Sequence, residues 1–220
     1  MRLILLVLLG LCMNAIAASP KRYLALGDSY TIGESIAETG RFPIQLVAAL
    51  HERGIAFEAP EIIARTGWTT AELQAAIDLA KPRPPYDLVT LLIGVNNQYR
   101  GGDLRRYRSE FSKLLMHAIA LAGRDKKQVL VISIPDWGVT PFARGDKRDA
   151  RRIAKQIDAF NAEARDVCAK NDVRFIDITP ASRDGGGETA MLAGDGLHPS
   201  AAMYARWVEV IMATAFPAAP

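Results

Sequence analysis

The chain has 220 residues, of which 50% are hydrophobic, and its 27 basic and 24 acidic residues give a formal net charge of +3. This length and composition suit one globular domain with a large buried core, and they leave too little chain for two. The two signs of charge are interspersed, so the basic clusters Arg105–Arg108 and Arg144–Arg152 are interpreted as solvated faces, and no nucleic-acid-binding surface is expected.

Residues 1–18 have the pattern of a signal peptide. A short basic start is followed by the apolar stretch Leu3–Met13 and by an Ala-x-Ala cleavage site ending near Ala17 or Ala18. We therefore expect residues 19–220 to form the mature domain, exported to the periplasm or secreted. The apolar stretch is too short to span a bilayer well, so no permanent membrane anchor is expected.

The chain contains two cysteines, Cys12 and Cys168. Lipid modification of Cys12 is an alternative to simple cleavage, but Leu11 stands where a small residue should precede the modified cysteine. Cleavage near Ala17 leaves Cys168 alone in the mature chain, which excludes an intrachain disulfide. Cys168 lies at an apolar position of a helical pattern, so we interpret it as a buried structural thiol.

Strand and helix patterns alternate along the mature chain. Short runs rich in β-branched and apolar residues predict five strands, at Tyr23–Ser29, Glu61–Thr66, Asp87–Gly94, Gln128–Ile134 and Val173–Thr179. Helical patterns fill the intervals: one between Pro43 and Gly54, one opened by a capping box of Thr69 and Glu72, two amphipathic helices over residues 104–118 and 153–167, and a last one from about Pro199 to Ala215.

This alternation predicts an α/β fold. Consecutive strands joined through helices form a parallel sheet with right-handed crossovers and helices on both faces, which is a three-layer α/β/α sandwich. The nearly continuous apolar run Leu88–Ile93 is typical of a strand buried on both faces.

Ligands of such a sheet bind outside the carboxyl ends of its strands, so the residues that follow each strand are the most informative. Polar and glycine-rich segments occur at four of these places. They are Gly27-Asp28-Ser29-Tyr30, Thr66-Gly67-Trp68, Gly94-Val95-Asn96-Asn97 and, after a long loop, Asp195-Gly196-Leu197-His198-Pro199. All are expected at one edge of the sheet.

These segments contain the parts of a serine hydrolase site. Ser29 is the candidate nucleophile and His198 the candidate base, because a hydroxyl must lose its proton during attack. Asp195, three residues before His198, can fold back onto the ring nitrogen that faces away from the serine and orient the imidazole. His51 and His117 fall inside predicted helices and are interpreted as surface or core residues.

Donors for a developing oxyanion are present as well. Asn96 offers a side-chain amide, Gly67 offers a backbone N–H with no side chain in the way, and the N–H of Ser29 completes a three-donor oxyanion hole. Each part alone has a plainer interpretation, since Gly-Asp-Ser, Asn and Asp-Gly are all common in turns and caps. Their coincidence at one edge favours the enzyme.

The order of Ser29, Asp195 and His198 along the chain fits a known hydrolase arrangement, but the Gly-x-Ser-x-Gly elbow is absent because Thr31 occupies the second glycine's position.

The sequence instead resembles the SGNH hydrolases, also called the GDSL lipase and esterase family. Gly27-Asp28-Ser29 matches the first family block, although Tyr30 replaces a leucine. Gly67 matches the glycine of the second block, Gly94-Val95-Asn96-Asn97 matches the third with Asn97 in place of an aspartate, and Asp195 and His198 match the last.

The resemblance covers nearly the whole mature chain and implies a flavodoxin-like sheet of five parallel strands. It implies that Ser29, Asp195 and His198 form a catalytic triad, and that Gly67 and Asn96 complete the oxyanion hole. It implies no metal and no organic cofactor. The replacement at Asn97 removes a family carboxylate and places the local loop geometry in question.

The substrate stays open at this stage. Aromatic residues at the expected catalytic edge are candidates for lining a pocket: Trp68, Tyr99, Trp137 and Phe142, the last two in a predicted long loop over residues 135–142. Small-molecule or lipid-like esters, including lysophospholipids and thioesters, are one expectation, and carbohydrate acetyl esters are the alternative. A non-catalytic module that binds an anion at the turn after the first strand is the competing hypothesis from another class.

Overall fold

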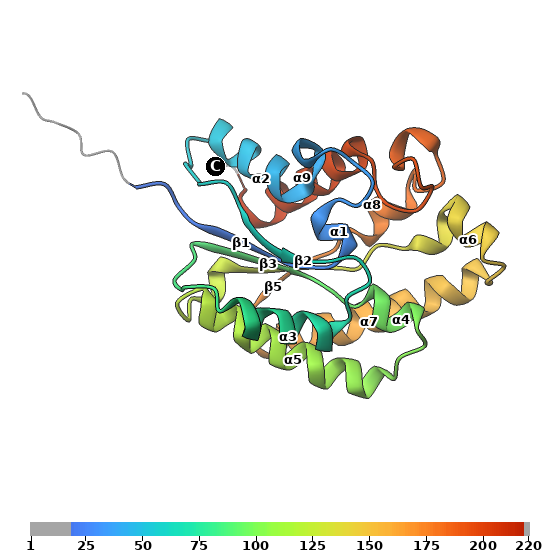
Figure 1. The fold of residues 1–220 in the computed structure, drawn as a ribbon, viewed down its shortest axis with the longest axis horizontal. Helices are drawn as coiled ribbons and strands as arrows, with labels where there is room; N and C mark the ends of the chain where they lie inside the picture. Colours follow the sequence, from blue (N-terminus) through green and yellow to red (C-terminus); the bar gives the residue numbers. More distant parts are fainter. Residues whose placement is uncertain (1–18, 218–220) are drawn as a thin grey trace, which may run out of the picture.

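A sheet of five parallel strands forms the centre of the computed structural model, which describes residues 19–217 (Figure 1). Its strands are β1 (Tyr23–Gly27), β2 (Glu61–Ala64), β3 (Leu88–Leu92), β4 (Val129–Ile132) and β5 (Arg174–Ile176). The order across the sheet, β2-β1-β3-β4-β5, is the flavodoxin-like order. In this order β2 lies on one side of β1, and β3, β4 and β5 follow one another on its other side. The predicted α/β fold and all five predicted strands are confirmed, and the predicted signal peptide lies outside the described residues.

Helices cover both faces of this sheet. They are α1 (Ser29–Ile32), α2 (Phe42–Glu52), α3 (Thr70–Ala80), α4 (Val95–Tyr99), α5 (Leu104–Leu121), α6 (Pro141–Gly145), α7 (Ala150–Lys170), α8 (Thr179–Arg183) and α9 (Ala201–Ala215). Figure 1 shows α2 and α9 on one face and α3, α5 and α7 on the other, with the short helices α1, α4 and α6 at one end of the sheet. The three predicted layers are therefore present.

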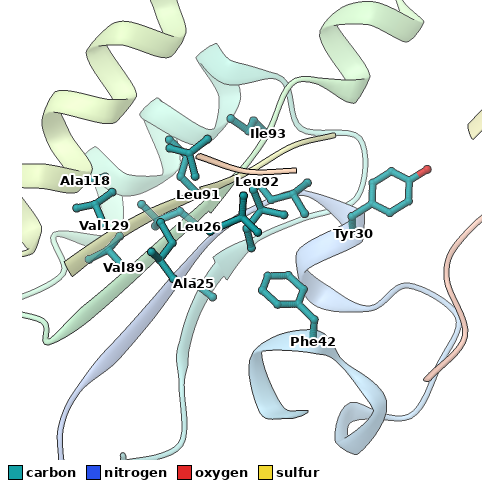
Figure 2. Packing of buried hydrophobic residues seen from close by; sticks show 14 of the residues in the cluster. Ala25, Leu26, Tyr30, Phe42, Val89, Leu91, Leu92, Ile93, Ala118 and Val129 are labelled. Carbon is teal, nitrogen blue, oxygen red and sulfur yellow. The ribbon is translucent and has the colours of Figure 1, made fainter. Parts of the chain in front are cut away.

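The core explains why the central strands lack a polar alternation. Every residue of β1 and of β3 is buried, since helices pack on both faces. Figure 2 shows Phe42 of α2 and Ala118 of α5 with the strand residues Leu26 and Leu91 between them. Full burial of each such leucine stabilises the fold by about 1.5–3 kcal/mol.

The helix termini follow from their capping residues. The capping box predicted for α3 is present, because Glu72 accepts the N–H of Thr69 and the Thr69 hydroxyl accepts the N–H of Glu72. The predicted start of the last helix at Pro199 is wrong. Ser200 caps α9 with its hydroxyl, which accepts the N–H of Met203, while Pro199 lies outside the helix.

Cys168 is buried in α7 as predicted, and burial raises the pKa of its thiol to about 12. Its depth favours the structural interpretation of this thiol.

His51 lies in α2 and His117 in α5, away from the carboxyl edge of the sheet. Within residues 19–217 no helix combines the length and the apolar character that crossing a membrane requires.

Candidate active site

The polar segments that follow the strands meet around one cavity at the carboxyl edge of the sheet. Its volume is about 190 Å³. The wall contains four of the five predicted site residues together with apolar and aromatic neighbours: Ser29, Tyr30, Thr66, Gly67, Val95, Asn96, Tyr99, Trp137, Phe142, Leu197 and His198. The fifth, Asp195, lies directly behind His198.

Ser29 stands at the first position of α1, not at the end of a strand as predicted. Asp28 caps this helix, since its Oδ1 accepts the N–H of Tyr30 at 3.0 Å, and the strand ends at Gly27. A side chain at Gly27 would clash, because a Cβ there would lie 2.0 Å from Oγ1 of Thr31. The first N–H groups of a helix have no partner within it, and the N–H of Ser29 has none among the described residues, so it can donate to an oxyanion.

His198 is held in one orientation by Asp195. Nδ1 of His198 lies 2.7 Å from Oδ2 of Asp195, and Oδ1 of the same carboxylate accepts the N–H groups of Leu197 at 2.9 Å and His198 at 3.0 Å. Gly196 makes this tight loop possible with a φ of +66°. The opposite ring nitrogen, Nε2, is thereby left without a hydrogen-bond partner among the described residues, and His198 lines the cavity.

The same hydrogen bonds control the charge of Asp195. Partial burial raises the pKa of this carboxyl, but the hydrogen bonds from His198, Ser35 and the backbone outweigh burial and hold the pKa well below its ordinary value. Asp195 is therefore ionised at neutral pH and suited to stabilise a protonated His198. In the free protein the hydroxyl of Ser29 has no hydrogen-bond partner among the described residues. Such bonds often form only when substrate is bound.

The two candidate oxyanion donors, Gly67 and Asn96, lie on different segments. The N–H of Trp68 bonds to the carbonyl of Arg65 at 3.2 Å, and Gly67 has a φ of +83°, as the third residue of a type II turn requires. Asn96 lies in α4, and its Nδ2 donates to the carbonyl of Trp68 at 3.0 Å. An amide nitrogen carries two hydrogens, so the second remains available for a substrate.

Asn97 has a structural task that suits an amide. Its Oδ1 accepts the N–H of Thr70 at 3.0 Å, and its Nδ2 donates to the hydroxyl of Thr70 at 2.8 Å. That hydroxyl in turn donates to Glu110. A carboxylate at position 97 would place the Thr70 hydroxyl between two acceptors, although it has only one hydrogen to donate. The amide of Asn97 instead donates to this hydroxyl while the hydroxyl donates to Glu110, and these bonds join α4 to the start of α3.

Aromatic side chains build one wall of the cavity. Tyr99, Trp137 and Phe142 follow one another, with ring centroids 5.3 Å and 6.2 Å apart, and Nε1 of Trp137 donates to Gln98 at 2.8 Å. The predicted long loop that carries two of them contains short helical turns over Trp137–Val139 and from Pro141 onward. Trp68, also a candidate, is not part of this wall.

Sequence reasoning did not predict the role of Tyr30 in the cavity. Its side chain projects from α1, away from the strands (Figure 2), and its ring lies 5.3 Å from that of His198. It also packs on Trp207 of α9, with centroids 6.2 Å apart. Its position directly after Ser29 was the available signal, but a single aromatic residue does not reveal which way it points.

A comparison with known protein families matches residues 25–206 to the model of the GDSL-like lipase/acylhydrolase family. The chain belongs to this family. As a GDSL-like hydrolase it is an enzyme that acts on ester bonds, and the resemblance noted in its sequence is confirmed. No curated protein matches the chain in a sequence comparison.

Solved structures share the fold of this GDSL-like hydrolase at low sequence identity. The crystal structure of TesA is 21% identical with a TM-score of 0.70, and the match covers 90% of this chain and 99% of that one. An acetyl-xylooligosaccharide esterase, Axe2 from Geobacillus, is 19% identical with a TM-score of 0.66, covering 89% and 94%. AlinE4, an SGNH-hydrolase family esterase, is 20% identical with a TM-score of 0.62, covering 91% and 97%.

The structure also bears on metal binding in this GDSL-like hydrolase. Among residues 19–217 no three or more His, Cys, Asp or Glu side chains are grouped so that they could hold a metal ion. Nδ1 of His198 and Oδ2 of Asp195 form a hydrogen bond with each other.

Proposed function

We propose that the protein is a serine esterase in which Ser29 attacks the ester carbonyl, His198 takes the proton and Asp195 orients the imidazole. The observation that supports this most strongly is the 2.7 Å hydrogen bond between Asp195 and His198, at the wall of the cavity that also contains Ser29. Asp195 fixes the proton on Nδ1 of His198, so Nε2 is left as the base.

The reaction proceeds through an acyl-enzyme. As Oγ of Ser29 bonds to the carbonyl carbon, its proton passes to His198, and the carbonyl oxygen becomes an oxyanion bound by the N–H groups of Ser29 and Gly67 and by Nδ2 of Asn96. His198 then gives the proton to the leaving alcohol or thiol. Water, deprotonated by the same imidazole, attacks the acyl-enzyme and releases the acid.

The size and character of the cavity favour a small apolar acyl or aryl group. A dry protein cavity of roughly 150 Å³ holds benzene. The volume of about 190 Å³ here and the wall of Tyr99, Trp137 and Phe142 therefore suit a group of about six carbon atoms. We propose carboxylic esters or thioesters with such a group as substrates, cleaved by the acyl-transfer chemistry that lysophospholipases, lipases and thioesterases share.

A carbohydrate O-deacetylase is the second candidate. It is supported by the small cavity, which accommodates an acetyl group, and by the similar fold of an acetyl-xylooligosaccharide esterase. The same residues would carry out the same chemistry, and the sugar would be the leaving alcohol. A non-catalytic binding module has lost support, since the chain belongs to a hydrolase family.

The experiment compares purified mature protein with its Ser29→Ala variant on p-nitrophenyl esters from acetate to palmitate and on acetylated xylooligosaccharides. The wild type is expected to be most active near butyrate and hexanoate, and the variant inactive on all esters. Activity that survives in the variant would contradict the assignment of Ser29. Release of acetate from the oligosaccharide at a higher kcat/KM than from any p-nitrophenyl ester would favour the deacetylase.

Export remains part of the proposal. The sequence pattern of residues 1–18 supports a signal peptide removed near Ala17 or Ala18, with the mature enzyme in the periplasm or outside the cell. Expression of the full chain in a bacterium followed by N-terminal sequencing tests this. Protein that stays in the cytoplasm with Met1 intact would contradict it.

A further inference from the structure

Arg100 joins the two segments that carry the candidate oxyanion donors. It follows α4, the helix that contains Asn96, and its guanidinium reaches back to the turn that contains Gly67. One nitrogen of this group, Nη2, donates to the carbonyl oxygen of Gly67 at 2.6 Å. A charged donor at this distance makes a hydrogen bond about twice as strong as a neutral one.

The guanidinium is itself held in place. Its other terminal nitrogen, Nη1, lies 3.2 Å from Oε2 of Glu72, the residue that forms the capping box of α3 with Thr69. These hydrogen bonds lower the pKa of Glu72, those from Thr69 most and that from Arg100 least, so the carboxylate stays charged. Arg100, whose side chain is about half exposed, thus bridges the start of α3 and the turn at Gly67.

Glycine makes such a restraint necessary. Gly67 has no side chain to pack, and glycine populates positive and negative φ about equally well. The turn gains its position from its neighbours: Thr66 bonds to Glu34, the carbonyl of Gly67 accepts from Arg100, and the carbonyl of Trp68 accepts from Asn96. Of these bonds, only the one from Arg100 acts on Gly67 itself.

We infer that Arg100 is a positioning residue of the oxyanion hole, which holds the N–H of Gly67 at the correct separation from the amide of Asn96. This inference rests on the proposed esterase function. Arg100 acts on the carbonyl of Gly67 from outside the cavity and does not touch the substrate. Because oxyanion donors act on the transition state more than on the bound ester, loss of Arg100 lowers kcat and leaves KM nearly unchanged.

The test compares Arg100→Gln and Arg100→Lys with Arg105→Gln, using p-nitrophenyl butyrate. Arg105 is an exposed arginine of α5 without an ion pair or side-chain hydrogen bond among the described residues, so its variant controls for lost surface charge. We expect Arg100→Gln to reduce kcat on the order of tenfold with KM within about twofold, since misplacing an active-site group by 1 Å can reduce a rate about a hundredfold. Arg100→Lys should fall between, and Arg105→Gln should match the wild type.

A second readout separates positioning from loss of structure. In an Arg100→Ala variant, added guanidinium ion at millimolar concentration should restore part of kcat, because it can occupy the site between Glu72 and Gly67. The same ion should not rescue Asn96→Ala. Unchanged kcat in Arg100→Gln, an equal loss in Arg105→Gln, or a loss that guanidinium does not relieve would overturn the inference. If the wild type hydrolyses no ester, the proposed function fails instead.

Discussion

Among single residues, Asn96 offers the most direct test of the proposed oxyanion hole. Its amide has one hydrogen on the carbonyl of Trp68 and one available for the substrate. We expect Asn96→Ala and Asn96→Asp each to reduce kcat on the order of 10²–10³-fold, because neither side chain can donate at neutral pH. Steady-state kinetics on p-nitrophenyl butyrate measures this, and a loss confined to KM would argue against the role.

Asp28, beside the candidate nucleophile, gives the stability of the fold a dependence on pH. The carboxyl is fully buried, and burial raises its pKa to about 7, although the N–H of Tyr30 opposes the shift. Its Oδ2 has no hydrogen-bond partner among the described residues. The native state therefore keeps a proton that the unfolded chain releases above about pH 4.

Stability from this group is fully present below about pH 4 and is lost as the pH rises toward 7, where the native carboxyl also ionises. We expect Asp28→Asn to lose less unfolding free energy between pH 5 and pH 8 than the wild type loses. Urea unfolding at both pH values measures the difference. Equal losses in the two proteins would show that the pH dependence arises elsewhere.

At the scale of elements, α5 provides a test of capping away from the cavity. Oδ1 of Asp103 accepts the N–H of Arg106 at 2.9 Å at the start of this helix. We expect Asp103→Ala to lower the unfolding free energy by about 1 kcal/mol and to leave ester hydrolysis unchanged. Ser109→Ala, at an exposed position within the same helix, is the control and should cause no loss. Chemical denaturation compares the variants.

The elements also show how far the sequence predicts this fold. The five strands, the capping box at Thr69 and the amphipathic helices α5 and α7 are visible in the sequence, because their patterns repeat over several residues. The short helices α1, α4 and α6 are not, since one turn is too short to show a period. The sequence pattern therefore extends the first strand to Ser29, whereas in the structure the strand ends at Gly27 and Asp28 caps a helix that begins at Ser29.

The candidate site was predictable to a similar degree. The sequence indicates that Ser29, Gly67, Asn96 and His198 lie close together, because a parallel sheet brings the segments after its strands to one edge, and the structure places all four in the wall of one cavity. Contacts between segments distant in sequence were not predictable. The bond from Arg100 to Gly67 depends on side-chain conformations that only the folded chain determines.

At the scale of the whole molecule, the strand order explains why distant residues share one cavity. After β2 the chain crosses to the other side of β1, so that β1 and β3 are neighbours in the sheet. Ser29 and Asn96 follow these two strands. α9, which packs against α2 on one face, follows the loop that presents His198. The site thus combines segments that follow β1, β2 and β3 with the loop before α9, and it requires the complete fold.

We propose above that Ser29 is a nucleophile activated by His198. The most direct measurement is mass spectrometry of the protein after reaction with a fluorophosphonate, followed by peptide mapping, for the wild type and for His198→Ala. We expect one adduct, on the peptide that contains Ser29, formed rapidly in the wild type and very slowly in the variant. An adduct on another residue would show that Ser29 is not the nucleophile, and equal labelling rates in the two proteins would show that His198 does not activate it.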